Sequence, residues 1–169
     1  MKIQIIGYSG SGKSTLAKKL SEFYNIPRLY LDTLKYYGNW EERSREDIRK
    51  DLQFFLDNND SWIIDGNYSS VCPNRFEESD ITIYLNYNRF FCYRMCKKRY
   101  KMYKDVPRES CNCKEKLDKQ FKRWILWEGR TNKVKKKHLD NLNKTKGQKL
   151  IFKNRRELNK WLEEIGCVS

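Results

Sequence analysis

The sequence predicts a single α/β domain in which about five parallel strands are covered on both faces by helices. Three observations predict this fold class. Short apolar runs alternate with segments of helical spacing along the whole chain, which implies right-handed crossovers. A glycine-rich turn at residues 7–15 joins the first apolar run to an amphipathic segment. The 169 residues suffice for one domain with its own core, and no linker or repeat divides it, apart from a lysine-rich patch at 133–146.

The individual elements follow from the spacing of apolar residues and from turn signals such as Asn25-Ile26-Pro27 and Asn58-Asn59-Asp60. The expected strands are residues 2–6, 28–31, 62–64, 80–85 and 148–152. The expected helices lie at residues 16–23, 48–56, 89–103, 117–125 and 158–165. Residues 105–116 are expected to form a loop.

The glycine-rich turn matches the phosphate-binding pattern G-x-x-x-x-G-K-S, with a strand before it and a helix after it. Glycines let backbone amides approach an anion, and the helix start adds positive potential. Lys13 is expected to reach the β- and γ-phosphates of ATP, and Ser14 to contact Mg²⁺. The residues expected to bind ATP here are Gly7, Ser9, Gly10, Ser11, Gly12, Lys13, Ser14 and Thr15. The fold expected is the three-layer fold of P-loop nucleotide hydrolases and kinases.

Two acidic residues follow expected strands. Asp65 ends an apolar run and is the expected second ligand of Mg²⁺, although Asp65-Gly66 is also compatible with a simple turn. Asp32 follows the second expected strand, where side chains of parallel sheets face the ligand crevice. It is a candidate to contact the phosphate acceptor or to take its proton, and capping of the next turn is the equally weighted alternative.

Residues 33–43 are rich in aromatic and turn residues. Trp40 and Arg43 could stack on and grip a planar or phosphorylated acceptor, whereas packing of surface aromatics on a neighbouring helix is the simpler alternative. Trp40 and Arg43 are kept as candidate acceptor residues, together with Asp32.

The net charge of +14 is concentrated in one region, because residues 97–137 contain 16 Lys and Arg against 5 Asp and Glu. A basic region can bind nucleic acid, bind a polyphosphate, or simply keep the protein soluble. Tyr100, Tyr103, Trp124 and Trp127 are interleaved there, but no helix-turn-helix, zinc-finger or RNA-binding signature accompanies them. Nucleic-acid binding is therefore an alternative that the sequence does not favour.

Composition also bounds the cellular setting. No apolar run has the length of a membrane span and the start lacks a signal-peptide pattern, so a cytoplasmic protein without a membrane partner is expected. Six cysteines are expected to be reduced thiols. Four metal ligands at usable spacing are not present around Cys111 and Cys113, and whether these two cysteines bind a metal is left open. A monomer is expected, with the oligomeric state left open.

With these motifs in place, the chain resembles the adenylate-kinase-like P-loop kinases, and within them the bacterial group of DNA topology modulation proteins. The resemblance covers essentially the whole chain. It rests on the blocks 7–15, Leu31-Asp32-Thr33, Asn39-Trp40, 62–68, Asn88-Arg89-Phe90 and 124–130.

The resemblance implies an acceptor-binding insertion near residues 33–60 and a lid near 100–130. It implies that Arg99 and Arg130 stabilise the transferred phosphoryl group. It also implies that Arg94 lies over the adenine, although one residue away from the usual spacing, and that the loop at Lys153-Asn154 encloses the base. Asn67-Tyr68 replaces the Phe-Pro-Arg of adenylate kinases, so Asn67 joins the candidate acceptor residues while a nucleoside monophosphate acceptor is in doubt.

Together these expectations describe a Mg²⁺-dependent kinase that uses ATP. Its acceptor would be nucleotide-like or a small hydroxylated molecule, with Lys13, Asp32, Arg99 and Arg130 as the catalytic candidates. A nucleotide-dependent DNA-binding protein and an ATPase without a small acceptor are the alternatives.

Overall fold

The computed structural model describes residues 1–38 and 40–167. Its centre is a five-stranded sheet in the order β2-β3-β1-β4-β5, in which every neighbouring pair is parallel. The strands are β1 (Lys2–Gly7), β2 (Arg28–Tyr30), β3 (Trp62–Asp65), β4 (Ile81–Leu85) and β5 (Gln148–Phe152). The predicted parallel sheet and its five strands are therefore confirmed.

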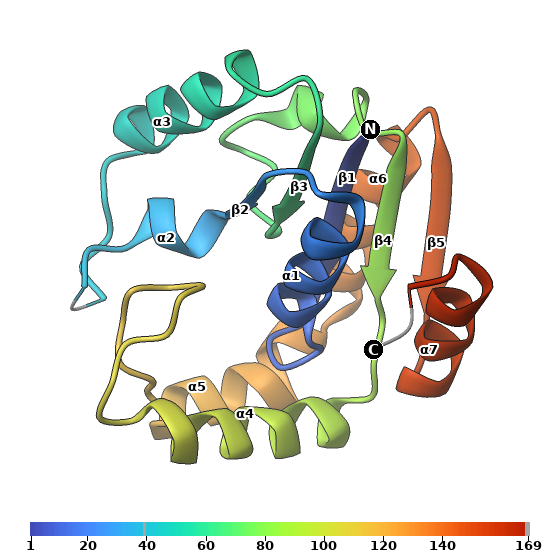
Figure 1. Ribbon diagram of the computed structural model, residues 1–169. Coiled ribbons are helices and arrows are strands. Elements are labelled where there is room, and N and C mark those ends of the chain that lie inside the picture. Colours follow the sequence, from blue (N-terminus) through green and yellow to red (C-terminus); the bar gives the residue numbers. More distant parts are fainter. Residues whose placement is uncertain (39, 168–169) are drawn as a thin grey trace.

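Helices connect the strands and cover both faces of the sheet, with α1 in front and α6 behind in Figure 1. The helices are α1 (Lys13–Tyr24), α2 (Leu31–Lys35), α3 (Arg45–Asp57), α4 (Arg89–Tyr103), α5 (Lys119–Leu126), α6 (Asn132–Lys144) and α7 (Arg155–Glu164). Two short 3₁₀ turns, η1 (Pro73–Phe76) and η2 (Glu128–Arg130), complete the elements.

The apolar core lies on the two faces of β1, β3 and β4. Their near-continuous Ile runs are buried on both sides, which is why these strands lack polar alternation. Phe23, near the end of α1, is 42% exposed and lies outside this core.

The second strand is shorter than expected. It ends at Tyr30, and the residues that follow form the short helix α2 instead of continuing to Asp32. Asp32 consequently lies in the first turn of α2, where a carboxylate is favoured by the helix dipole. Asn39, which the resemblance includes, lies outside the described residues.

A buried arginine organises the loop that follows β3. The guanidinium of Arg75, fully buried, donates to the carbonyl oxygens of Tyr68 and Cys72 and to the side chain of Gln4. Burial lowers the pKa of Arg75 to about 10, which leaves it charged at neutral pH. The loop is thereby fixed beside the carboxyl ends of β1 and β3, where α4 and α5 also lie (Figure 1).

Candidate active site

The glycine-rich turn connects β1 directly to α1. Gly10 and Gly12 have φ angles of +79° and +93°, which favour glycine, and a Cβ at Gly10 would lie 2.3 Å from the carbonyl oxygen of Cys92. Asn67 fixes the start of the turn, because its side chain accepts from the Gly7 amide at 3.0 Å and donates to the Gly7 carbonyl at 2.8 Å. Asn67 therefore positions the turn, and the acceptor role expected for it stays a prediction.

Ser14 and Asp65 meet at the base of this turn. The Ser14 hydroxyl donates to Asp65 Oδ2 at 2.6 Å, and Asp65 Oδ1 is buried with no hydrogen-bond partner among the described residues. Burial raises the pKa of Asp65, while the nearby Lys13 and the Ser14 hydrogen bond work in the opposite direction. An unpartnered carboxylate oxygen beside a serine hydroxyl fits Mg²⁺, which takes oxygen ligands and commonly binds through one or two carboxylates.

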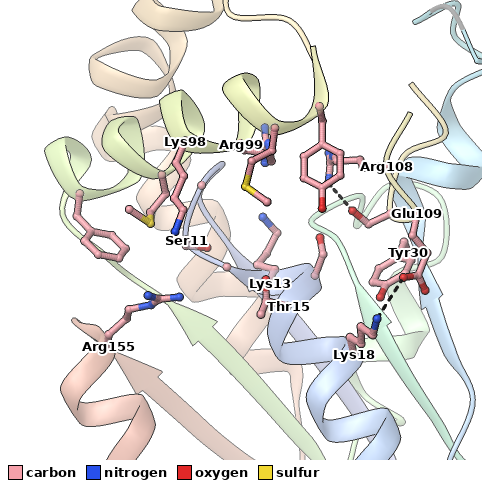
Figure 2. A pocket seen from close by; sticks show the side chains of 18 residues that line it. Ser11, Lys13, Thr15, Lys18, Tyr30, Lys98, Arg99, Arg108, Glu109 and Arg155 are labelled. Atoms are coloured by element: carbon pink, nitrogen blue, oxygen red, sulfur yellow. Dashed lines mark hydrogen bonds and ion pairs between the residues drawn. The ribbon is translucent and has the colours of Figure 1, made fainter. Parts of the chain in front are cut away.

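The turn opens into a cavity of about 370 Å³. Figure 2 shows the Lys13 side chain pointing from α1 toward Lys98 and Arg99 on α4. The cavity is strongly basic, because one acid, Glu109, lines it against six cations: Lys13, Lys18, Lys98, Arg99, Arg108 and Arg155. Such a concentration of cations around a glycine-rich turn suits a polyphosphate.

A second group of polar side chains surrounds Asp32. Tyr68 donates its hydroxyl to Asp32 Oδ1 at 2.7 Å, and a terminal nitrogen of Arg108 lies 3.7 Å from Oδ2. Burial and the neighbouring Asp32 raise the pKa of Tyr68, so this hydroxyl remains a donor. The Asp32 carboxylate is thus oriented and partly exposed close to Asp65, where it could accept a proton from an acceptor hydroxyl.

Arg99 and Arg130, the two expected lid arginines, have different surroundings. Arg99 lines the cavity, whereas Arg130 lies under the turn, with its guanidinium 3.6 Å from the centre of the Tyr8 ring. Arg130 also donates to the carbonyl oxygens of Tyr87 and Ile125. Arg99 therefore shares the cavity with Lys13, whereas Arg130 contacts the turn at Tyr8, and the role expected of Arg130 in phosphoryl transfer stays a prediction.

The residues expected at the base end do not line the cavity. Arg94 is exposed and stacks on Phe91, and Asn154 caps α7 by accepting from the Glu157 amide at 3.0 Å. Residues near them in the sequence line the cavity instead: Phe91, Met95 and Met102 of α4, and Arg155 of α7.

Trp40 and Arg43 also have structural partners. The Trp40 indole donates to the carbonyl oxygen of Lys114 at 2.7 Å, which ties the segment after α2 to the loop that follows α4. Arg43 pairs with Asp51 on α3 at 2.7 Å. Neither residue lines the cavity, and the acceptor role kept for them stays a prediction.

The thiols of the loop after α4 are buried. Cys113 donates to the carbonyl oxygen of Tyr37 at 3.2 Å, and burial, with Asp32 nearby, raises the pKa of Cys111 to about 12. A thiol with a raised pKa is a poor nucleophile, so Cys111 is not a candidate for nucleophilic chemistry. The hydrogen bond from Cys113 to Tyr37 fixes the loop.

Reasoning from the sequence missed Arg108, Glu115, Lys98 and Arg155. Of these four residues, Lys98 was detectable from the sequence. It lies on one helix face at three- and four-residue spacing with Phe91, Met95, Arg99 and Met102. Arg108 and Glu115 lie in a loop, where no periodicity marks them.

His138, the single histidine, is buried behind the turn against the rings of Tyr8 and Tyr84. Burial, with the positive charges of Lys13, Lys137 and Arg130, lowers the pKa of His138 to about 4. Between about pH 6.5 and pH 4 the unfolded chain holds the extra proton, so stability falls as the pH falls through this window, by on the order of 2–3 kcal/mol.

We therefore expect the melting temperature to decline from pH 6.5 to pH 4 and the decline to be shallower in His138→Phe. Thermal unfolding followed by circular dichroism at half-unit pH steps measures both profiles. Equal slopes in the two proteins would contradict the neutral, buried state of His138.

No family model and no curated protein matches this sequence. Solved structures match in fold. A shikimate kinase from Bacteroides thetaiotaomicron is 18% identical, with a TM-score of 0.56 over 98% of this chain and 96% of that chain. A deoxyadenosine kinase from M. mycoides with bound dATP is 15% identical, with a TM-score of 0.57 over 98% and 97%. At these identities the likeness concerns the fold, and the chain has the three-layer α/β fold of the P-loop kinases.

Proposed function

We propose that the protein is an ATP-binding kinase that transfers the γ-phosphoryl group of Mg-ATP to a small acceptor. The observation that carries this proposal is the basic cavity of about 370 Å³ into which the glycine-rich turn opens beside the Ser14–Asp65 pair. Phosphoryl transfer asks the protein mainly for positioning and charge neutralisation, and the cavity residues supply both.

Each part of the cavity has a proposed role. Lys13 and the amides of residues 10–15 bind the phosphates, and Arg99 neutralises charge that develops on the transferred group. Ser14 and Asp65 would hold Mg²⁺, which screens the charge of the phosphates when bound. Phe91, Met95, Met102 and Arg155 form the apolar and cationic end that would receive the base.

The acceptor end is proposed at Asp32. The acceptor donates its hydroxyl proton to the Asp32 carboxylate, and Tyr68 and Arg108 hold that carboxylate in place. Residues 33–60 would form the acceptor side and residues 100–130 the lid. The acceptor class proposed is a nucleotide-like or small hydroxylated molecule; one of the two similar structures named above is a deoxyadenosine kinase and the other a shikimate kinase.

Membership of the DNA topology modulation group remains part of this proposal, resting on the sequence blocks named above. A nucleic-acid role is less supported, since Lys98, Arg99 and Arg108 of the basic region line the cavity and would be used by a polyphosphate. No helix of the described residues could span a membrane.

The proposal is tested by calorimetric titration of the purified chain with Mg-ATP. We expect binding, and we expect Lys13→Ala to weaken it about 10–100-fold, because a charged hydrogen-bond donor to the phosphates is lost. Within the described residues, the Lys13 ammonium donates one hydrogen bond, to the carbonyl oxygen of Tyr8, so the variant should fold. Lys19→Ala on the same helix is the control, because Lys19 does not line the cavity.

A screen of nucleosides, nucleotides and small hydroxylated metabolites for acceptor-stimulated ADP release then separates a kinase from an ATPase. Unchanged binding in Lys13→Ala, or no heat with Mg-ATP for the folded wild-type chain, would contradict the proposed function.

A further inference from the structure

Glu115 is a buried acid that the proposed mechanism leaves without a role. It lies in the loop after α4, its side chain is 1% exposed, and its amide donates to the Tyr103 carbonyl at the end of α4. A carboxylate at this depth is stable only when opposite charges surround it.

Two cavity arginines provide those charges. Arg99 Nε lies 3.0 Å from Glu115 Oε2, and Arg108 Nε lies 2.6 Å from Oε1. Both contacts are ion pairs at close range, so Coulombic attraction holds the two guanidinium groups to the carboxylate. Burial works to lower the pKa of Arg108, yet Glu115 and Asp32 outweigh burial and raise it, so the guanidinium stays charged.

Glu115 engages the Nε edge of both arginines and leaves their outer nitrogens turned away from it. One terminal nitrogen of Arg108 donates to the Ser110 hydroxyl, and the other lies 3.7 Å from Asp32 Oδ2. In Figure 2, Arg99 comes from α4 and Arg108 lies beside it, in the loop that follows α4, and both line the cavity with Lys13. One carboxylate therefore connects the arginine of the phosphate end with the arginine of the acceptor end.

We infer that Glu115 is a positioning residue that holds the guanidinium groups of Arg99 and Arg108 over the glycine-rich turn. This inference rests on the proposed function, because the expected consequence is a change in the affinity for the phosphates of Mg-ATP. Without the negative charge, two buried guanidinium groups repel each other, and neither keeps its orientation toward the phosphates.

The test is a double-mutant cycle that combines Glu115→Gln with Arg99→Ala/Arg108→Ala, read by calorimetric titration with Mg-ATP. Glu115→Gln keeps the shape of the side chain and removes its charge. We expect it to weaken Mg-ATP binding about 10–30-fold in the wild-type background. In the background that lacks both arginines, we expect less than a twofold effect, because the groups through which Glu115 acts are gone.

Three comparisons make the result decisive. Glu115→Asp keeps the charge and should recover part of the affinity. Glu128→Gln is the matched control, because Glu128 pairs with Arg123 on the exposed surface, and it should bind like wild type. We expect Glu115→Gln to lower the melting temperature by roughly 5–15 °C, and unfolding curves confirm that each titrated variant is folded.

An equal loss of affinity in both backgrounds would reveal a merely structural role and overturn the inference, as would wild-type affinity in folded Glu115→Gln. If Glu115→Gln does not fold, Glu115→Asp replaces it in the same cycle, with an expected effect of about threefold in the wild-type background alone. Absence of Mg-ATP binding by the wild-type chain would instead overturn the proposed function and this role with it.

Discussion

Replacing Arg99 by alanine is expected to slow phosphoryl transfer on the order of 10³-fold, because an arginine that neutralises the transferred phosphoryl group has at least this effect in related chemistry. Arg99 is suited to this role by its place in the cavity wall opposite Lys13. The measurement is single-turnover ADP formation with the best acceptor from the screen. The melting temperature should fall only moderately, since Glu115 keeps its ion pair with Arg108.

Arg130→Ala provides an informative contrast, because Arg130 stacks on Tyr8 and donates to two backbone carbonyl groups behind the turn. It should lower stability more than Arg99→Ala does. Lys101→Ala, an exposed cation on α4 that does not line the cavity, is the matched control for charge and should retain the wild-type rate. An Arg99→Ala variant with a rate within tenfold of wild type would contradict the assignment.

Replacing Asp65 by asparagine is expected to lower the transfer rate but to raise the stability of the metal-free protein. The transfer rate should fall on the order of 10²–10³-fold, since the variant loses the carboxylate that would bind Mg²⁺. In metal-free buffer at pH 7, however, the variant should melt about 2–6 °C higher than wild type.

The reason lies in the raised pKa of Asp65. The folded chain holds this proton to a higher pH than the unfolded chain does, so stability declines as the pH rises from the unfolded pKa to the folded pKa, and a neutral amide at this position avoids that loss. Scanning calorimetry of both proteins with and without MgCl₂ measures the effect. Mg²⁺ should raise the melting temperature of the wild-type chain only, and a lower melting temperature for metal-free Asp65→Asn would contradict this account.

The parts of the site that are contiguous in the chain could be predicted from the sequence. Residues 7–15 need only a strand before them and a helix after them, and both are set by local apolar spacing. Asp65 was found for a similar reason, because an apolar run that ends in an acid places that acid at the carboxyl edge of a parallel sheet.

The sequence could not distinguish the neighbours of functional positions. Asn154 and Arg155 are adjacent, but Asn154 is used as the cap of α7 while Arg155 lines the cavity. Likewise, Arg94 and Met95 are adjacent on α4, and a rotation of about 100° per residue decides which of them faces the cavity.

The loop after α4 was beyond prediction for a different reason. Arg108 and Glu115 are fixed by contacts with α4 and with Asp32, which lie outside the loop. A loop has no periodic spacing from which a buried side chain could be predicted.

The sequence by itself determined the parallel α/β fold, the glycine-rich turn, and the Lys13, Ser14 and Asp65 side chains around it, because local spacing and strand ends specify them. Only the tertiary structure decided that Arg99 lines the cavity while Arg130 stacks on Tyr8, and that Glu115 joins Arg99 to Arg108. The physical reason is that charged side chains on loops and helix faces are oriented by long-range ion pairs and burial, and these arise only once the chain has folded.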